Sequence, residues 1–395
     1  MKELVKKFIP RFLLSWYHLA LAFLGALLYG FPSRKLKVIG ITGTNGKTTV
    51  VSFTTKILES AGYRVASLSS IKFKVGDKER PNNLKMTMPG RFKIQKILRE
   101  AANSGCQYAV LEVTSEGIKQ HRHRFIDFEA AVFTNLTPEH IEAHKGFENY
   151  KKAKGNLFRA VKKIHIVNQE DENAEYFLSF SAKKKYTYGF DKGDINNKDL
   201  QLNLHLLGKF NIYNALAAVC VGLSQGINLA LCKKAVEEVR NMPGRMEEVI
   251  SQPFRVFVDY AFTPNALEQA YLTLKPKNSR MICILGACGG GRDKWKRPVL
   301  GKIAARYCDE IIVTNEDPYN EDPMQIIEQV AAGAERAQKI LDRREAIKAG
   351  LKMARANDVV IVTGKGSELW LVCRGQKIPW NEKKIIQEEF KKLNQ

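Results

Sequence analysis

The chain has 395 residues, and at about 100–200 residues per domain this length predicts two or three domains. Its composition, with 45% hydrophobic, 9% aromatic and 26% charged residues, excludes disordered, collagen-like and polytopic membrane proteins. Lys and Arg number 63 against 41 Asp and Glu, giving a formal charge of +22. This charge favours an anionic partner: nucleic acid, a phosphorylated metabolite or an acidic membrane surface.

The seven cysteines show no pattern of a disulfide framework or a zinc site. Their number is odd, and they are scattered without a C-x-x-C pair. We therefore expect a reducing, cytoplasmic environment.

An apolar stretch, Phe12–Phe31, lies near the start of the chain and is long enough in principle to cross a bilayer. It has no small-residue cleavage site, so a secretory signal is not indicated. Basic residues lie on both sides, so the positive-inside rule gives no orientation. Three interpretations stay open: a helix packed on the protein or a partner, an interfacial membrane anchor, and a membrane span. The flanking basic residues are Lys2, Lys6, Lys7, Arg11, Arg34, Lys35 and Lys37.

From Leu36 onward, short β-rich runs alternate with helical stretches. Because parallel strands need crossover connections, this alternation predicts an α/β fold with a parallel sheet covered by helices on both faces. The predicted strands are Lys37–Thr42, Tyr108–Val113, Ala130–Thr134 and Ile164–Asn168, and the predicted helices are Thr48–Ser60, Phe92–Asn103 and Tyr150–Lys162.

A polar stretch, Lys183–Asp199, has no apolar period and is interpreted as a loop or short hairpin before a helix at Asn211–Leu223. The breaker cluster Asn241–Arg245 follows, and the βα alternation then restarts, which predicts a second α/β domain. Its predicted strands are Arg255–Asp259, Met281–Leu285, Glu310–Thr314 and Val359–Thr363, with a last helix at Glu382–Leu393.

The most informative residues are those of a glycine-rich turn between a β-run and a helix. There, backbone N–H groups and the helix N-terminus can surround a phosphate. Lys47 would reach the β- and γ-phosphates, and Thr48 would offer its hydroxyl to Mg²⁺. The standard phosphate-loop (Walker A) spacing places its first glycine at position 41, where this sequence has Ile41. The predicted nucleotide-binding residues are Gly43, Thr44, Asn45, Gly46, Lys47, Thr48 and Thr49.

This spelling, TGTNGKTT, resembles the Mur ligases, the ATP-dependent amide-bond synthetases of cell-wall peptide assembly. The resemblance spans Leu36 to the C-terminus and is greatest to the tripeptide-synthetase (MurE-type) branch. It implies ATP and Mg²⁺ as cofactors, a central P-loop domain with a mostly parallel sheet, and a C-terminal Rossmann-like α/β domain. The implied division is an apolar helical segment at 1–35, the central domain at 36–243 and the C-terminal domain at 244–395.

The resemblance also implies a metal site. Glu112 in LEVTSEG matches the family's metal-binding glutamate, and His140 follows TNLTPE, where Glu139 replaces the usual Asp. Lys154 in YKKAKGNLF matches a carbamylated lysine, whose carbamate is a hard oxygen ligand of the kind that Mg²⁺ prefers. The implied metal ligands are Thr48, Glu112, His140 and Lys154.

Substrate contacts are implied by three further matches. Gln120 and Arg122 stand in a QHR segment, Thr114 lies in the glutamate motif, and Thr87 stands in Thr87-Met88-Pro89 where the branch has TTP. An arginine such as Arg122 can hold a carboxylate or phosphate through two hydrogen bonds.

The second half of the chain completes the implied nucleotide site. Asn214 ends GKFNIYN, Arg245 stands in PGRME, and Asp259 stands in VDYAFTPN. Phe262 and Asn265 depart from the family's VDYAHTPD. The implied catalytic residues are Lys47, His140, Lys154 and Arg245, with Arg245 balancing charge in phosphoryl transfer.

A run GACGGGRDKWKRP resembles a tripeptide-synthetase signature, and GKGSE later in the chain carries Ser367 in place of a usual His. The amino-acid-selecting loop is Glu316–Pro323, where diaminopimelate-adding relatives carry DNPR with an Arg at the position of Tyr319. This puts diaminopimelate in doubt and leaves lysine or another amino acid open. The remaining implied substrate-binding residues are Asp317, Pro318, Gly366 and Glu368.

Full-length relatives hold the UDP end of their substrate with about a hundred residues before the phosphate loop, and here about 40 precede it. The apolar stretch could instead hold the enzyme at the inner membrane face near a lipid-linked acceptor. Alternatively, a partner supplies the missing part, or the helix caps a shortened core.

The sequence therefore predicts a cytoplasmic, monomeric ligase that adds an amino acid to a muramyl-peptide-type acceptor through an acyl phosphate, with association with the membrane's inner face left open. Two rivals are a folylpolyglutamate-type ligase and a non-catalytic ATP-binding scaffold at the membrane. The changes at Met88, Phe262, Asn265 and Ser367 keep the scaffold open. We expect no nucleic-acid partner, because no motif accompanies the charge.

Overall fold

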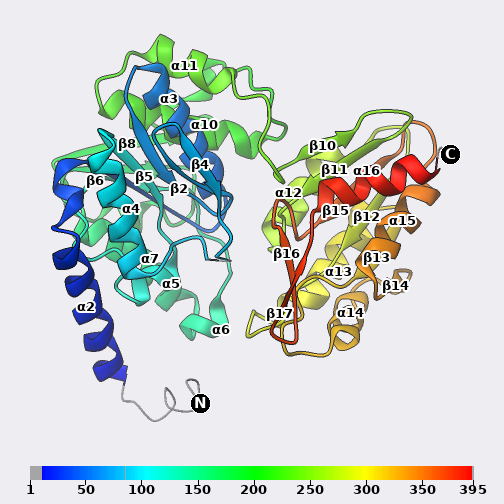
Figure 1. The fold of residues 1–395 in the computed structure, drawn as a ribbon. Helices are drawn as coiled ribbons and strands as arrows, with labels where there is room; N and C mark the ends of the chain where they lie inside the picture. The colour runs from blue at the N-terminus through cyan, green and yellow to red at the C-terminus, as the bar shows by residue number, and fades with distance from the viewer. Residues whose placement is uncertain (1–10, 85, 394–395) are drawn as a thin grey trace. The chain divides into compact units, whose positions relative to one another are not determined.

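The structure is a computed structural model that describes residues 11–84 and 86–393 (Figure 1). It divides into two compact units. Unit 1 contains the residues up to Leu136, Phe147–His205 and Phe210–Val239. Unit 2 contains Thr137–Gly146, Leu206–Lys209 and the residues from Arg240 onward.

Within the described part of unit 1, nine strands form one sheet in the order β4-β3-β2-β5-β1-β6-β7-β8-β9. The pairs from β2 to β9 are parallel, and β3 and β4 are added antiparallel at one edge. The strands are β1 (Lys37–Thr42), β2 (Val65–Leu68), β3 (Lys72–Val75), β4 (Lys78–Pro81), β5 (Tyr108–Glu112), β6 (Phe128–Phe133), β7 (Ile164–Asn168), β8 (Lys184–Gly189) and β9 (Ile195–Asn196).

Helices cover both faces of this sheet because its central strands are apolar on both sides. One core joins the sheet to α4, α7 and α8, and Phe133 of β6 stacks on Phe177 of α8 with ring centroids 3.8 Å apart. On the other face α3 packs on β1, β2 and β5, with α11 behind it. The helices are α2 (Arg11–Leu28), the 3-10 turn η1 (Pro32–Lys35), α3 (Lys47–Ser60), α4 (Arg91–Asn103), α5 (Ser115–Lys119), α7 (Phe147–Ala160), α8 (Ala174–Leu178), α9 (Asn197–Leu200), α10 (Lys209–Ser224) and α11 (Leu229–Glu237).

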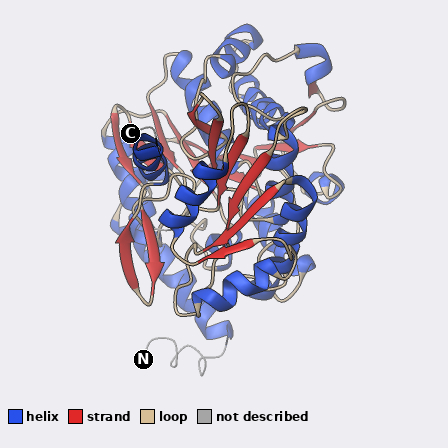
Figure 2. Ribbon diagram, turned by 90° about the vertical axis from the view of Figure 1, so that its right-hand side faces the viewer, coloured by secondary structure: helices blue, strands red, loops and turns tan. Residues whose placement is uncertain are grey.

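Unit 2 is built in the same way around a smaller sheet, seen from its own side in Figure 2. In its described residues six strands run in the order β10-β11-β15-β12-β13-β14, all parallel except β10. The strands are β10 (Glu247–Ile250), β11 (Arg255–Asp259), β12 (Met281–Leu285), β13 (Glu310–Thr314), β14 (Gln338–Ile340) and β15 (Val359–Thr363), with a separate hairpin of β16 (Trp370–Cys373) and β17 (Gln376–Pro379). The helices are α6 (Ile141–His144), α12 (Pro264–Leu274), α13 (Lys296–Tyr307), α14 (Pro323–Ala331), α15 (Arg343–Met353) and α16 (Glu382–Leu393).

The α/β class with a mostly parallel sheet and a second sheet is confirmed. The prediction for Lys183–Asp199 is wrong, because β8 extends the main sheet by parallel pairing with β7. Only Tyr188 and Gly189 of β8 are buried, so the strand has no apolar alternation in the sequence.

The predicted apolar helix is α2, and residues 1–10 of the predicted N-terminal segment lie outside the described residues. No helix in the described chain has both the length and the apolar character needed to cross a membrane.

Candidate active site

The phosphate loop of unit 1 connects β1 to α3 at the carboxyl edge of the sheet. β1 lies between β5 and β6 in parallel pairing, so the segments that follow these three strands meet at one edge. Two glycines of the loop have left-handed backbone, Gly43 with φ 149° and Gly46 with φ 82°. A Cβ on Gly43 would lie 1.9 Å from Thr134 Oγ1. The backbone of the loop therefore lies so close to the segment after β6 that no side chain fits at position 43.

The loop is held in place by the residues that follow β6. The Asn45 amide donates to Asn135 Oδ1 at 2.9 Å, and Thr134 Oγ1 donates to the Asn45 carbonyl at 2.7 Å. Thr44 contributes its amide to the Asn135 carbonyl at 2.8 Å and its hydroxyl to a 3.1 Å bond with Tyr150. Thr49 is buried at the start of α3. The loop is therefore fixed by hydrogen bonds to Thr134, Asn135 and Tyr150.

Two lysines meet at one carbonyl oxygen of this loop. Lys47 Nζ donates to Gly43 O at 3.0 Å and to Thr44 O at 2.7 Å, and Lys154 Nζ donates to Gly43 O at 2.7 Å. Lys154 is 1% exposed and lies over the Tyr150 ring, 4.6 Å from its centroid. Burial, and then the charge of Lys47, lowers the pKa of Lys154 well below its ordinary value. Lys154 thus tends toward a neutral, nucleophilic amine.

Hydrogen bonds through Ser70 connect the start of α3 to the end of β5. Thr48 Oγ1 lies 2.8 Å from Ser70 Oγ, and the Ser70 amide donates to Glu112 Oε1 at 2.8 Å. Glu112 is 2% exposed. A hydroxyl and a buried carboxylate beside a phosphate loop are the oxygen donors that suit Mg²⁺.

The other predicted metal ligand, His140, belongs to unit 2. It is the residue just before α6 and has a left-handed backbone with φ 57°. In the described residues, no group of three or more His, Cys, Asp and Glu side chains could hold a metal. A metal site built from the predicted set would therefore depend on Thr48 and on a modified Lys154 as well.

Asn214 lies against the phosphate loop, as the nucleotide-site prediction requires. A Cβ on Gly46 would be 2.2 Å from Asn214 Oδ1, and Asn211 Oδ1 accepts from Asn214 Nδ2 at 3.1 Å. α10 thus presents an amide to the turn, and Asn211, the first asparagine of the GKFNIYN run, orients it.

The predicted substrate residues of unit 1 gather around α5. Thr114 caps the helix by accepting from the Gly117 amide at 3.1 Å. Arg122 donates to the Met88 carbonyl and to Gln120 Oε1, the latter at 2.9 Å. Thr87 is half-buried next to Met88. The guanidinium of Arg122 is therefore oriented by its neighbours.

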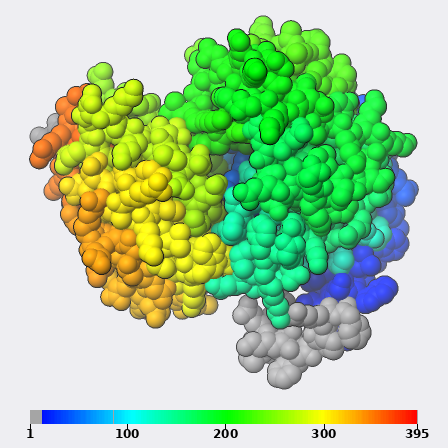
Figure 3. Space-filling model, turned by 180° about the vertical axis from the view of Figure 1, so that it is seen from behind, coloured from blue at the N-terminus to red at the C-terminus, as the bar shows by residue number. Residues whose placement is uncertain are grey.

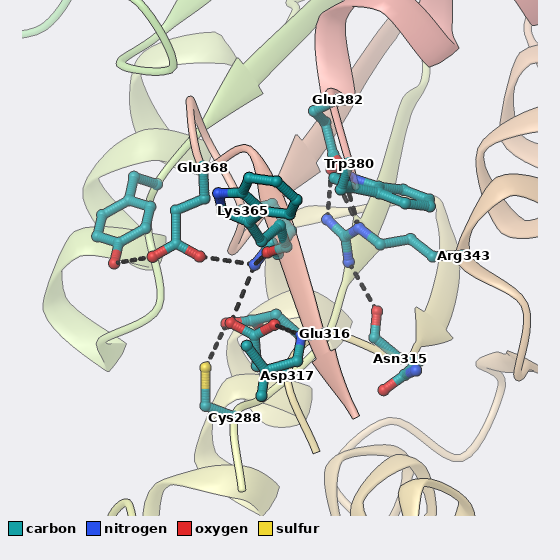
Figure 4. Close-up of polar contacts among 12 residues, drawn as sticks. Cys288, Asn315, Glu316, Asp317, Arg343, Lys365, Glu368, Trp380 and Glu382 are labelled. Atoms are coloured by element: carbon teal, nitrogen blue, oxygen red, sulfur yellow. Dashed lines mark hydrogen bonds and ion pairs between the residues drawn. The ribbon is translucent and has the colours of Figure 1, made fainter. Parts of the chain in front are cut away.

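Unit 2 collects a second group at the carboxyl edge of its own sheet, after the neighbouring strands β11, β15, β12 and β13. Buried Lys365 donates to Asp317 Oδ2 at 2.9 Å and to Glu368 Oε2 at 2.6 Å (Figure 4). Burial opposes the charge of Lys365, but Glu368 and Asp317 outweigh it and raise its pKa. The sequence prediction named Gly366 and Glu368 of the GKGSE run but did not include Lys365, which stands in the same run.

Tyr260 and Glu316, which sequence reasoning also missed, connect the rest of this group. Tyr260 OH donates to Glu368 Oε1 at 3.0 Å, and Cys288 Sγ donates to Glu316 Oε1 at 2.8 Å. A Cβ on Gly366 would lie 2.8 Å from Tyr260 Cβ. These contacts bring the predicted residues Gly366 and Glu368 together.

Arg245 and Asp259 lie beside the same tyrosine. The Arg245 guanidinium stands over the Tyr260 ring, 4.3 Å from its centroid. Asp259 accepts from the Met246 and Ala261 amides, each at 2.7 Å, so its carboxylate fixes the backbone on both sides of the group. Burial raises the pKa of Asp259, and Arg245 partly offsets this.

The selecting loop contributes Asp317, Pro318 and Tyr319. The Tyr319 amide donates to Val372 O at 3.1 Å, and its φ is 54°. Its ring covers Gly290, where a Cβ would lie 2.6 Å from Tyr319 Cδ2, and the Gly289 Cβ position is 2.3 Å from Pro318 O. Burial raises the pKa of Tyr319 to about 12, so its phenol stays neutral near pH 7.

The RDK-x-KRP run holds the His140 segment within unit 2. Lys296 Nζ lies 2.9 Å from Glu139 Oε1, with side chains 2% and 3% exposed. Asp293 accepts from the Ile141 and Glu142 amides at 3.1 and 3.0 Å. The glutamate that replaces the family's usual aspartate is thus the partner of a buried lysine.

Comparison with known proteins agrees with this geometry. The profile of the Mur ligase middle domain matches residues 41–222, and that of the Mur ligase glutamate ligase domain matches residues 244–366. A UDP-N-acetylmuramoyl-L-alanyl-D-glutamate–2,6-diaminopimelate ligase of Syntrophomonas wolfei is 37% identical over 93% of this chain and 81% of its own. The UDP-N-acetylmuramyl-tripeptide synthetase of a Roseiflexus species is 35% identical over 92% and 80%.

The chain belongs to the Mur ligase family. A solved UDP-N-acetylmuramoyl-L-alanyl-D-glutamate–2,6-diaminopimelate ligase superposes with a TM-score of 0.60 at 29% identity, over 91% of this chain and 79% of its own. The Mycobacterium tuberculosis folylpolyglutamate synthase has a TM-score of 0.71 at 18% identity, over 88% and 92%, and shares the fold. The resemblance to the tripeptide-synthetase branch is thereby confirmed, and folylpolyglutamate synthase is a structural relative only.

Replacing Gly46 of this Mur ligase with alanine should weaken ATP binding about tenfold or more, measured by isothermal titration, because the new Cβ would meet Asn214. Gly62→Ala is the matched control: Gly62 has φ 85°, close to that of Gly46, but no atom within 4 Å of its Cβ position. Equal ATP affinity in the two variants would contradict the assignment of this turn.

Glu139→Gln should lower the free energy of unfolding of unit 2 by about 3–5 kcal/mol, because it leaves the Lys296 charge buried without its carboxylate. Urea unfolding can be followed through Trp295, Trp370 and Trp380, all in unit 2. The control Glu345→Gln removes a pair with Lys348 whose side chains are 59% and 36% exposed, and should cost less than about 1 kcal/mol. Equal losses of unfolding free energy in the two variants would contradict the predicted contribution of the Glu139–Lys296 pair.

Proposed function

We propose that this Mur ligase is an ATP-dependent, ADP-forming ligase that joins an amino acid to a muramyl-peptide-type acceptor through an amide bond. The observation that carries the proposal is the meeting of Lys47 and buried Lys154 at the Gly43 carbonyl of the phosphate loop. A tight strand-to-helix turn alone would need neither lysine. The relatives that match over most of the chain bear the names of such ligases.

The acceptor carboxylate would attack the γ-phosphate of ATP, giving an acyl phosphate and ADP, and the amine of the amino acid would then displace phosphate. Lys47 and Arg245 would balance the charge of the phosphates. Asn214 would contact the nucleotide at the turn. Asp259 would contact the ribose or adenylate part of ATP, and it also orients the segment that carries Arg245. Burial of the reacting groups would protect the acyl phosphate from water.

Mg²⁺ would be held by Thr48, Glu112, His140 and the carbamate of Lys154, and it would neutralise phosphate charge. The lowered pKa of Lys154 supports this, since CO₂ adds to a neutral amine and the new N–C bond forms with loss of a proton. The carbamate would convert a cation into an anion beside the loop.

Thr87, Thr114, Gln120 and Arg122 would bind the acceptor, with Arg122 oriented toward a carboxylate or phosphate. Asp317, Pro318, Tyr319, Gly366 and Glu368 would bind the amino acid. Tyr319 carries no positive charge, so it cannot form the two-bond ion pair that an Arg at this position would make with a second carboxylate. This favours an amino acid other than diaminopimelate.

The proposed setting is a cytoplasmic monomer that meets a UDP-linked or lipid-linked acceptor at the inner membrane face. The proposed domain boundaries lie between residues 35 and 36, where the apolar segment ends, and between residues 243 and 244, where the C-terminal domain begins. A non-catalytic ATP-binding scaffold is the second candidate, favoured by Phe262, Asn265 and Ser367, which depart from the family pattern.

The test is amino-acid-dependent phosphate release from ATP with the full chain. UDP-linked and lipid-linked muramyl dipeptide should each be tried with lysine, diaminopimelate and other amino acids. We expect turnover with one pairing that does not contain diaminopimelate. Lys47→Met should abolish turnover, whereas Lys56→Met, on the same helix but 40% exposed, should not. If no pairing releases phosphate while ATP still binds, the ligase proposal is overturned in favour of the scaffold.

A further inference from the structure

α2 is attached to unit 1 by one face. Ala22 and Ala26, 2% and 0% exposed, face the protein, and at Gly25 the helix approaches the start of α4 closely enough that a Cβ would lie 3.6 Å from the Arg91 backbone. Polar bonds support this packing at both ends: Ser15 Oγ lies 2.8 Å from His121 Nε2, and Arg99 Nε donates to Tyr29 O at 2.7 Å. Figure 1 shows α2 beside α4 at the edge of the unit.

The opposite face of α2 is apolar and exposed. Its residues recur at three- and four-residue spacing, so they form one stripe along the helix. Of the 16 large hydrophobic side chains that are exposed in the described chain, seven lie in α2. On most protein surfaces such side chains are scattered one by one rather than clustered in one helix. We call this face the α2 stripe; it comprises Leu13 (49% exposed), Trp16 (68%), Tyr17 (57%), Ala20, Leu24 (49%), Leu27 (53%) and Leu28 (69%).

The chain segment that contains the stripe carries charge of one sign only. From residue 4 to residue 58 the sequence contains no Asp or Glu. Basic residues precede the stripe and follow it, and Arg34 and Lys35 in the turn after α2 are exposed, as is Lys93 at the start of α4. In Figure 3 the dark-blue atoms of the first residues of α2 are seen at the surface. An apolar stripe with aromatic residues and basic flanks matches an anionic lipid surface, where each Lys or Arg adds to the attraction.

We propose that α2 lies in the plane of an anionic bilayer surface, with the α2 stripe among the acyl chains and the basic residues at the headgroups. Its inner face is held by α4, so the helix can present only one side to lipid. A second copy of the chain fits less well, because two stripes placed together would bring the basic ends of one helix against the basic ends of the other. This deepens the proposed function by placing the ligase beside a lipid-linked acceptor, but binding to lipid itself does not depend on catalysis.

The test is flotation of the full chain, without ATP or acceptor, with vesicles of phosphatidylcholine alone or mixed with phosphatidylglycerol. We expect binding to the anionic vesicles, and Leu24→Glu with Leu27→Glu should weaken it about tenfold or more. The matched control is Leu272→Glu with Leu341→Glu, since these leucines of unit 2 are 49% and 46% exposed. Circular dichroism and ATP binding establish that both double variants are folded.

Each further outcome decides the proposal. Equal binding of both double variants, or no binding of the natural chain, would overturn it. So would a dimer in sedimentation equilibrium that Leu24→Glu with Leu27→Glu dissociates, which would assign the stripe to a second copy. Lipid quenching of Trp16 fluorescence, absent from Trp16→Phe, would support insertion. Phosphate release with a soluble UDP-linked acceptor tests the ligase separately, so failure of one proposal does not count against the other.

Discussion

The site depends on one carbonyl oxygen, that of Gly43, which accepts from both Lys47 and Lys154. The two amines are brought together by backbone that only glycine tolerates, since a side chain at position 43 would collide with Thr134. Two ammonium groups this close repel, and one of them is buried, so the pKa of Lys154 falls. The electrostatic conflict is relieved if an anion binds: a phosphate beside Lys47, or a carbamate formed on Lys154. The loop is thus arranged to be completed by negative charge.

The two sheets position everything else by the same rule, that parallel strands end at a common edge. In unit 1 this edge joins the loop after β1 to Glu112 at the end of β5 and to Asn135 after β6. In unit 2 it joins Tyr260, Lys365, Cys288 and Asp317 after four neighbouring strands. Both edges contain buried charges, and those of Lys365, Asp317 and Glu368 satisfy one another. The fold therefore offers two polar groups on rigid supports. The charges of the unit 2 group satisfy one another, whereas the unit 1 group keeps two lysines close together at one carbonyl oxygen.

The sequence was informative where a local pattern decides the structure. The phosphate loop, the apolar strands and the helix α10 could be predicted because their signals lie within about ten residues. β8 could not, because it lies toward the edge of the sheet with Lys184 and Lys185 exposed, and pairing with β7 rather than its own apolar pattern makes it a strand. The pair of Glu139 and Lys296 joins residues 157 positions apart, and neither residue alone signals burial. Lys365 was missed for the same reason, because its partner Asp317 lies 48 positions away in the sequence.

The central claim is that Lys154 is an uncharged amine that takes up CO₂ beside the phosphate loop. It is tested most directly by ¹³C NMR of the full chain equilibrated with ¹³C-bicarbonate and Mg²⁺. The account predicts a carbamate resonance that disappears in Lys154→Ala and persists in Lys152→Ala, whose lysine is exposed on the same helix. A natural chain without such a resonance, or a resonance that survives in Lys154→Ala, would contradict it.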